Sequence, residues 1–201
     1  MGTDKPFSPA CARNSEPIAS VLVPLLQDIE SVLEIGSGTG QHAVCFGARS
    51  PHLVWQTSDL PENHQGIRQW VDEAALPNVL PPLHLDVDQS AWPVERVSAV
   101  FTANTLHIAA WSSVQNMFRG VSRVLDSNGL FCVYGPFRYG DVHTSESNAR
   151  FDASLRAHNS HSGIRAFEDV HELAHRNGLK LQSDYIMPAN NRLLIFRKAD
   201  P

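Results

Sequence analysis

The sequence predicts one α/β domain across its 201 residues, with a mostly parallel sheet and helices on both faces of that sheet. Three observations predict this fold. Short apolar stretches of strand length alternate with segments of helical periodicity through most of the chain. A glycine-rich turn joins the first strand to the next helix. Two strand-like segments follow one another at the end of the chain, and they add an antiparallel pair to one edge of the sheet.

In the first half of the chain, polar and apolar residues set the expected elements. Residues 1–16 are polar and contain prolines, so we expect an arm there, and Pro17 suits the first turn of the next helix. The β-branched, apolar run before the glycines is typical of a buried strand. The expected elements are an arm at 1–16, a helix at 17–28, strands at 31–35 and 53–58 (the latter ending at Asp59), helices at 41–49 and 61–75, and a short strand at 83–87.

The second half continues the alternation and ends with the strand pair. Val114, Phe118 and Val121 recur with the period of an amphipathic helix. Gly178 suits the position just after a helix end, and Pro188 begins a hairpin-like connection at 188–191. The expected elements are strands at 97–103 and 130–134 with a helix at 111–125 and a turn at 126–129 between them, a loop at 135–147, helices at 146–158 and 167–177, and strands at 179–186 and 192–197.

The composition narrows the class of protein and of substrate. The formal net charge is −5 and the charges are scattered, so no basic stripe for a nucleic acid is expected. Cys11, Cys45 and Cys132 are far apart and form no C-x-x-C pair, which favours a reducing, cytoplasmic setting. The first five residues lack the apolar segment of a signal peptide, and no window reaches ~18 apolar residues, so no membrane partner is expected. A small-molecule substrate fits these properties, while the oligomeric state is not predicted.

The glycine-rich turn has a spacing that points to one kind of ligand. Gly36, Gly38 and Gly40 alternate after Glu34, and no lysine follows to hold a phosphate, as it would in a phosphate-binding loop. The pattern E-x-G-x-G-x-G resembles the first motif of class I S-adenosylmethionine-dependent methyltransferases. This resemblance implies a Rossmann-like fold with a seven-stranded sheet in the order 3-2-1-4-5-7-6, the last strand antiparallel. It also implies S-adenosyl-L-methionine as the cofactor and S-adenosyl-L-homocysteine as its product.

Four strand ends are expected to meet at the carboxyl edge of the sheet, where ligands of such folds bind. The glycine turn would approach the methionine part of the cofactor, and Asp59 would accept hydrogen bonds from both ribose hydroxyls. Asp86 and Val87 suit an adenine edge and face. Taken singly, each acid is equally a helix cap or a solvated loop residue. The predicted cofactor-binding residues are Glu34, Gly36, Ser37, Gly38, Thr39, Gly40, His42, Asp59, Leu60, Asp86, Val87, Asn104, Thr105 and His107.

Further blocks cover nearly the whole chain and resemble the small methyltransferase-like 26 family. They are Phe7-Ser8-Pro9-Ala10, Arg13-Asn14-x-Glu16-Pro17-Ile18, Tyr134-Gly135-Pro136-Phe137, the segment from Thr144-Ser145-Glu146-Ser147-Asn148 to Leu155-Arg156, and Gly163-Ile164-Arg165. The Thr-Ser-Glu-Ser-Asn block is highly specific to that family. The resemblance implies a class I methyltransferase fold and S-adenosylmethionine binding, and it implies no substrate.

The same blocks supply candidates for the acceptor site and its lid. On a helix at 146–158, Asn148, Asp152 and Arg156 share one face, which is either solvated or borders the pocket. Phe151, Leu155 and His158 share another face, which is expected to be the core side. Arg13 and Asn14 belong either to a lid formed by the arm at 1–16 or to a salt bridge and cap. The substrate and lid candidates are Arg13, Asn14, Tyr134, Phe137, Ser145, Asn148, Asp152 and Arg156.

Methyl transfer requires alignment of two reactants, and a base only where the nucleophile must lose a proton. His107 is the first candidate base by position and by its ordinary pKa range, and it is equally suited to structuring the next helix. Tyr134 is the second candidate.

One rival motif points to different chemistry. His171, Glu172 and His175 match H-E-x-x-H, which on a helix holds zinc with a glutamate base. Zinc needs a third protein ligand, but Leu181 stands where the extended motif has histidine, and only Asp184 and Asp200 follow among the acids. We therefore expect no metal.

The sequence thus predicts an S-adenosylmethionine-dependent methyltransferase acting on an unidentified small molecule. One alternative is a protein that binds this cofactor without methyl transfer, as a sensor, an interaction module or the catalyst of another reaction on the sulfonium. The other is a zinc-dependent hydrolase built on His171, Glu172 and His175.

Overall fold

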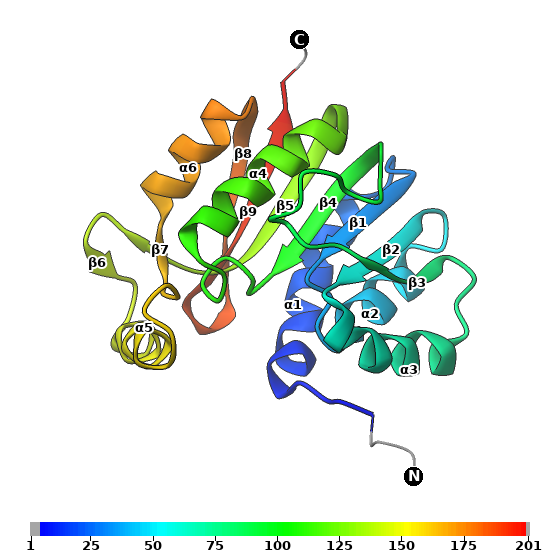
Figure 1. The fold of residues 1–201 in the computed structure, drawn as a ribbon, viewed down its shortest axis with the longest axis horizontal. Coiled ribbons are helices and arrows are strands. Elements are labelled where there is room, and N and C mark those ends of the chain that lie inside the picture. The colour runs from blue at the N-terminus through cyan, green and yellow to red at the C-terminus, as the bar shows by residue number, and fades with distance from the viewer. Residues whose placement is uncertain (1–4, 200–201) are drawn as a thin grey trace.

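Residues 5–199 are described by a computed structural model, in which a central sheet lies between two layers of helices (Figure 1). Helices α1, α2 and α3 cover one face, and α4 and α6 cover the other. The helices are α1 Pro9–Leu25, α2 Gln41–Arg49, α3 His64–Ala74, α4 Trp111–Val124, α5 Glu146–His158 and α6 Phe167–Arg176, with short 3₁₀ helices η1 Pro61–Asn63 and η2 Pro188–Asn190. The strands are β1 Ser31–Ile35, β2 Val54–Asp59, β3 Val79–His84, β4 Val97–Ala103, β5 Leu125–Tyr139, β6 Val142–His143, β7 Arg165–Ala166, β8 Leu179–Met187 and β9 Asn191–Lys198.

The order of the strands confirms the predicted fold class. The main sheet runs β3-β2-β1-β4-β5-β9-β8, with β1 to β5 parallel and β9 antiparallel to both of its neighbours. With β8 and β9 counted as the sixth and seventh strands, this is the expected order 3-2-1-4-5-7-6. Two short strands were not expected: β6 and β7 both pair with the outer end of β5. They carry α5 on an excursion between β5 and α6.

Apolar residues on both faces of the sheet build two cores, because a parallel sheet is covered on each side. Along β4, Phe101 packs towards α1 and α2 with Phe46 and Trp55, and its neighbour Val100 packs towards α4 with Phe118. This alternation follows the two-residue period of a strand. The near-continuous apolar run of β4 is therefore explained by burial on both faces.

The first helix begins eight residues earlier than expected. Pro9 occupies its first turn, and the Ser8 hydroxyl caps it by accepting a hydrogen bond from the Cys11 N–H at 3.2 Å. A serine before a proline is itself a helix-start signal, and Pro17, which is expected in the first turn, lies inside the helix. From residue 9 onwards the predicted arm is thus helix. Residues 1–4 of that arm, and Asp200 at the other end, lie outside the described residues.

The third strand is also shifted, from the expected 83–87 to Val79–His84. Pro81 and Pro82 are unfavourable in a strand, since proline cannot donate to a ladder. They are tolerated because β3 is an edge strand that pairs only with β2, with an irregular register between Gln56 and Ser58. Asp86 and Val87 consequently follow the strand instead of ending it.

The fifth strand is much longer than expected, because it includes both the predicted turn at 126–129 and the first part of the predicted loop at 135–147. Its outer half pairs with β6 and β7. The glycines and serines of this segment are typical of a loop, so the sequence did not indicate these pairings. No helix within residues 5–199 combines the length and the hydropathy that crossing a membrane requires.

Candidate functional site

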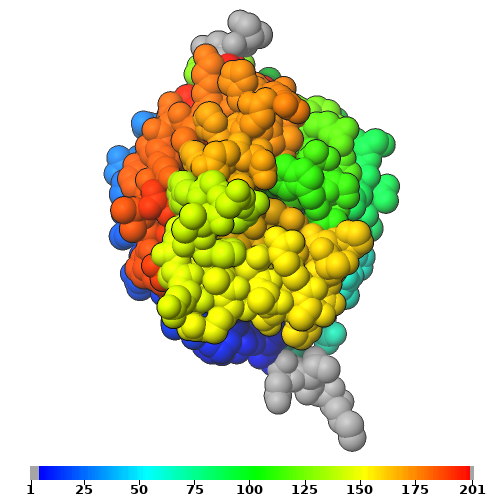
Figure 2. All heavy atoms as spheres, turned by 90° about the vertical axis from the view of Figure 1, so that its left-hand side faces the viewer, coloured from blue at the N-terminus to red at the C-terminus, as the bar shows by residue number. Residues whose placement is uncertain are grey.

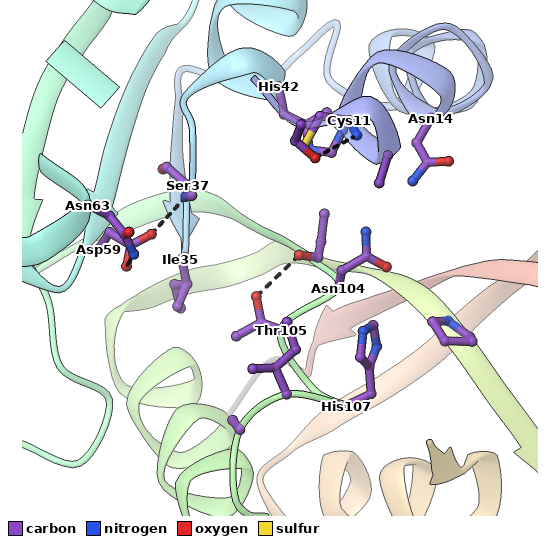
Figure 3. Close-up of a pocket in the computed structure, with 18 of the residues that line it drawn as sticks. Cys11, Asn14, Ile35, Ser37, His42, Asp59, Asn63, Asn104, Thr105 and His107 are labelled. Atoms are coloured by element: carbon purple, nitrogen blue, oxygen red, sulfur yellow. Dashed lines mark hydrogen bonds between the residues drawn. The ribbon is translucent and has the colours of Figure 1, made fainter. Parts of the chain in front are cut away.

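A cavity of about 930 Å³ lies at the carboxyl ends of the parallel strands. The turns after β1 to β4, the end of β5, the first turns of α1, one side of α5 and the turn between β8 and β9 all line it. Figure 3 shows Asp59 and Asn63 on one side of the cavity, Asn104 and His107 on the other, and Cys11 and Asn14 of α1 across from them. The strand order explains this layout, because residues after β2 and β3 lie on one side of β1 and residues after β4 and β5 on the other.

Most of the sequence-predicted site residues meet at this cavity. Those that line it are Arg13, Asn14, Gly36, Ser37, Gly38, His42, Asp59, Leu60, Asp86, Val87, Asn104, Thr105, His107 and Asn148. Those that do not line it are Glu34, Thr39, Gly40, Tyr134, Phe137, Ser145, Asp152 and Arg156. Thr39 lines a smaller neighbouring hollow with Ser8 and Asn63.

The glycine-rich turn is bound tightly to the adjacent strand. The N–H groups of Gly36 and Ser37 both donate to the Ser58 carbonyl at 3.0 Å. Gly36 has a φ of +72°, and a Cβ placed on it would lie 2.9 Å from Thr105 Oγ1. Only glycine therefore lets the turn pass so close to the loop after β4.

The Asp59 carboxylate is fixed at the end of β2. Its Oδ2 accepts from the Gly38 N–H at 2.7 Å, and its Oδ1 accepts from the Leu60 N–H at 2.7 Å and from Asn63 Nδ2 at 2.8 Å. Asn63 also lines the cavity, and no motif in the sequence marks it as a site residue. Three donors orient a buried carboxylate at the cavity wall, where Oδ1 already accepts two hydrogen bonds and Oδ2, with one, retains capacity for a further donor.

Glu34 lies behind the turn instead of in the cavity. Its Oε2 accepts from the Ser37 hydroxyl at 2.8 Å and from Trp55 Nε1 at 3.2 Å. Burial raises the pKa of Glu34 to about 7, and the nearby Asp59 charge adds to this rise. The arrangement makes Glu34 a support for Ser37.

His42 lines the cavity from the first turn of α2, directly after the glycine turn. Its ring stacks on Phe46 with centroids 5.3 Å apart and meets the edge of Phe101. Its Nε2 is buried without a hydrogen-bond partner among the described residues. Burial lowers the pKa of His42 to about 4, so the ring is neutral at neutral pH.

This lowered pKa predicts a pH dependence of stability. The folded chain keeps His42 neutral, whereas the unfolded chain protonates it below about pH 6.5. The contribution to the free energy of unfolding is thus present above that pH and is lost as the pH falls towards 4. The free energy of unfolding of the wild type should rise between pH 5 and pH 7.5. In His42→Leu this rise should be about 2 kcal/mol smaller, as measured by urea titration at both pH values. The exposed His161→Leu is the control, and an unchanged pH gain in His42→Leu would contradict the prediction.

The loop after β4 presents His107 and Asn104 to the cavity. Asn104 has a φ of +60°, a left-handed conformation that asparagine tolerates better than most residues, and its N–H donates to the Tyr134 carbonyl at 2.8 Å. The His107 ring lies edge-to-face with Phe151 of α5, with centroids 5.3 Å apart. Burial, together with the charge of Arg165, lowers the pKa of His107 to about 4. His107 is therefore a neutral imidazole at neutral pH.

Arg165, which was named only within a family block, holds this loop in place. Its guanidinium donates to the carbonyls of Leu106 at 3.0 Å and His161 at 2.9 Å and also to that of Ala109. The Gly163 N–H donates to the His107 carbonyl at 2.8 Å. A single side chain of β7 thus joins the loop after β4 to the segment that follows α5.

Tyr134 and Phe137 do not reach the cavity, which corrects their prediction as site residues. Consecutive strand residues point to opposite faces, so Tyr134 packs in the core under α1 and Phe137 in the core under α4. Burial raises the pKa of Tyr134 to about 12. Pro136, which lies between them, lines the cavity in their place.

Helix α5 turns its polar face inward, which is one of the two alternatives for that face, and leaves much of the expected core face exposed. Asn148 and Asp152 are buried, whereas Phe151 is 44% exposed and His158 is exposed. The helix packs on the backbone of the segment before β7, where Asp152 Oδ1 accepts from the Ile164 N–H at 2.6 Å. A buried backbone N–H needs an acceptor, which a carboxylate supplies and an aliphatic side chain does not, so the polar face is the buried one.

The other candidates on α5 are structural in this fold. The Ser145 hydroxyl caps the helix by accepting from the Asn148 N–H at 3.1 Å. Arg156 Nε donates to Asp152 Oδ2 at 3.0 Å. Burial opposes ionisation of Asp152, but the hydrogen bonds from Arg156 and Ile164 outweigh it and lower its pKa. Asn148 alone of the predicted polar face lines the cavity.

Figure 2 shows how the excursion between β5 and α6 encloses this end of the molecule. The yellow-green and yellow surface of β6 and α5 lies directly above the blue surface of the N-terminal residues. Arg13, Asn14 and Cys11 of α1 line the cavity together with Asn148 and Phe151 of α5. The first turns of a helix, and not an extended arm, thus border the cavity on this side.

The H-E-x-x-H residues lie on α6, away from the cavity lining. The His171 ring stacks on Phe167 with centroids 5.7 Å apart, and Glu172 Oε1 accepts from Arg176 Nε at 2.7 Å. Within residues 5–199, no three His, Cys, Asp or Glu side chains are grouped so that they could hold a metal ion.

Comparison with known proteins gives a family and a fold. A family model described as a protein of unknown function (DUF938) matches residues 5–198. The mitomycin 7-O-methyltransferase MmcR superimposes with a TM-score of 0.84 at 14% identity, over 94% of this chain and 54% of that one. An O-methyltransferase family protein from Burkholderia thailandensis gives 0.84 at 16%, over 95% and 58%. Human N-acetylserotonin methyltransferase, solved in complex with SAM, gives 0.80 at 15%, over 95% and 53%.

The chain spans little more than half the length of these three solved structures. At such identities the similarity establishes the class I methyltransferase fold that these proteins share with it.

Proposed function

This chain belongs to the DUF938 family of proteins of unknown function, and we propose that it is a methyltransferase that transfers the methyl group of S-adenosylmethionine to a small molecule. One observation supports this most strongly: the turns after β1, β2, β3 and β4 line a single cavity. Their chemistry follows the order that a nucleoside linked to an amino acid requires. The proposal includes a single domain across residues 1–201 and the finer resemblance to the methyltransferase-like 26 family.

The residues on the β1 to β3 side fit S-adenosylmethionine. The glycine turn leaves room for the methionine part. The oriented Asp59 carboxylate can accept one ribose hydroxyl at Oδ2 and the other at Oδ1 in place of the Asn63 amide. Val87 and Asp86 fit the face and edge of an adenine ring. A volume of about 930 Å³ is near the upper end for a drug-sized ligand, so a small acceptor fits beside the cofactor.

Bound S-adenosylmethionine supplies an electrophilic methyl group on a positively charged sulfur. The chain's own contribution is then mainly alignment, which is worth several orders of magnitude in rate. The loop after β4, which Arg165 fixes, lines the cavity with Asn104 and His107, and these side chains would contact the two reactants. His107 is neutral at neutral pH and is free to take up a proton there.

Binding of the cofactor provides the first test. Calorimetry of the wild-type chain with S-adenosylmethionine and S-adenosylhomocysteine should give saturable binding of both. At a ligand concentration of 100 times Kd, the chain should gain about 2.7 kcal/mol of stability. For a domain of this size, that corresponds to a rise in Tm of about 5–10 °C. The absence of both binding heat and a Tm shift with either ligand would refute the proposal.

Product release then separates an enzyme from a binding module. The chain should release S-adenosylhomocysteine when a metabolite extract is added, and not in its absence. In the binding measurement, ATP is the control ligand, because a general nucleotide site would bind both ATP and S-adenosylmethionine. Tight cofactor binding without any acceptor-dependent release would favour a protein that binds the cofactor and transfers no methyl group.

A further inference from the structure

The cavity has two sides of different electrostatic character. Its lining carboxylates are Asp59, which ends β2, and Asp86 and Asp88, which follow β3. The side formed by the loop after β4, the end of β5 and α5 is lined by Asn104, His107, Ile108, Pro136, Asn148 and Phe151. Since His107 is neutral at neutral pH, none of these six side chains carries a formal charge. Among the described residues that line the cavity, Arg13 of α1 is the one lysine or arginine, and its side chain is exposed to water.

Two apolar side chains on this uncharged side are exposed to solvent. Ile108 is 59% exposed and Phe151 is 44% exposed, although both lie at a cavity. Exposed apolar groups gathered at one concave site indicate a surface that a ligand covers. Phe151 is held there because the next residue of α5, Asp152, is fixed by the hydrogen bond that it accepts from the Ile164 N–H. The exposure of Phe151 therefore follows from how α5 is anchored.

The rings of Phe151 and His107 form a corner. Their centroids are 5.3 Å apart, and their planes meet at 74°. A flat aromatic molecule can stack on one of two rings so arranged while its edge meets the other. A neutral imidazole at that edge offers either a donor or an acceptor nitrogen to a hydroxyl group.

We propose that the methyl acceptor is an uncharged aromatic hydroxyl compound, whose ring packs on Phe151 and Ile108 and whose hydroxyl faces His107. This inference rests on the proposed methyltransferase function and specifies its substrate class. An ammonium group would find no carboxylate on this side of the cavity, and a carboxylate would lie against apolar side chains. The neighbouring amide of Asn104 adds a polar group without adding charge.

The reaction balances with groups that are already present. A lone pair of the hydroxyl oxygen forms a bond to the methyl carbon as the carbon–sulfur bond breaks, and that bond's electron pair stays on sulfur. The sulfonium becomes the neutral thioether of S-adenosylhomocysteine. The hydroxyl proton becomes acidic as the new bond forms, passes to the free nitrogen of His107 and then leaves to water.

Four naphthalene derivatives of similar size test the acceptor class: naphthol, naphthoic acid, naphthylmethylamine and decahydronaphthol. Their binding to the complex of the chain with S-adenosylhomocysteine is measured by calorimetry, and methylation by release of S-adenosylhomocysteine from S-adenosylmethionine. Naphthol should bind at least about tenfold more tightly than each of the other three. Equal or tighter binding of the acid, the amine or the saturated alcohol would overturn the inference.

A pair of matched variants locates the binding site. Phe151→Ala should weaken naphthol binding by about tenfold or more while the Kd of S-adenosylhomocysteine changes less than twofold. Ile186→Ala is the control, because Ile186 is an apolar residue of β8 that is 82% exposed and does not line the cavity. Unchanged naphthol binding in Phe151→Ala would overturn the placement. Failure of the wild-type chain to bind S-adenosylhomocysteine would instead overturn the proposed function, so the two failures are distinct.

Discussion

Replacing Asp59 with alanine is expected to weaken the binding of S-adenosylmethionine by at least about 100-fold. Two hydrogen bonds from ribose hydroxyls to a carboxylate contribute roughly 1.5–3 kcal/mol each, and the variant loses both. The variant also frees the Gly38 N–H and the Asn63 amide, which the carboxylate holds at 2.7 and 2.8 Å. Both effects act in the same direction, because a looser glycine turn lowers affinity as well. Calorimetric titration of both proteins measures the change.

Asp126→Ala provides the matched control. Asp126 is also a hydrogen-bonded carboxylate, since it accepts from Arg96 Nε at 2.7 Å, but it lies on β5 near the opposite end of the sheet. Its removal should leave the Kd of S-adenosylmethionine unchanged within about twofold. Circular dichroism of each variant separates lost binding from lost folding. Binding by folded Asp59→Ala within threefold of wild type would exclude Asp59 from the cofactor site.

Replacing Gly40 with valine is expected to lower the free energy of unfolding by roughly 3 kcal/mol or more. Gly40 has a φ of +90°, which a β-branched residue rarely adopts. A Cβ at this position would lie 3.2 Å from the Cα and 3.3 Å from the carbonyl oxygen of Ile67, so it meets the backbone of α3 and not a flexible side chain. The helix cannot move aside, because Ile67 is itself fully buried in the core. Urea titration measures the loss.

Gly140→Val separates backbone strain from the close approach. Gly140 also has a positive φ, of +57°, but no atom lies within 4 Å of a Cβ built on it. It should therefore lose only about 1–2 kcal/mol, which is the strain of a left-handed residue. An equal loss in the two variants would show that the contact with α3 contributes nothing.

The order of the main sheet was predictable because its signals are local and agree with one another. Strand-length apolar runs, the glycine turn and the two final strands together leave few possible topologies, because the crossover connections between parallel strands are right-handed. The Asp59 and Gly36 positions followed in turn, because both stand at strand ends that the topology brings together.

The errors arose where a distant partner decides the local structure. Prolines in β3 and glycines in β5 argued against strands, but an edge position and the pairing with β6 and β7 outweighed them. The start of α1 was a different error, since Ser8 and Pro9 do form a local signal. There the second proline, Pro17, misled the prediction.

The least predictable features concern which way a helix faces. The face of α5 with Phe151 and Leu155 seemed suited to a core, yet the helix packs on backbone donors that its own sequence does not reveal. The role of Arg165 depends on carbonyls of a loop more than fifty residues earlier in the chain. Such contacts are set by tertiary structure, and no periodicity in the sequence encodes them.

The anchoring of α5 on β6 and β7 has a consequence for how this family can change over time. The glycine turn and Asp59 belong to β1 and β2, whereas Phe151 belongs to an excursion held by the far end of β5 and by Asp152 and Arg165. The two sides of the cavity are therefore encoded by separate stretches of the gene. A substitution in the excursion can therefore alter the Phe151 side of the cavity without touching the hydrogen bonds that hold the glycine turn and Asp59.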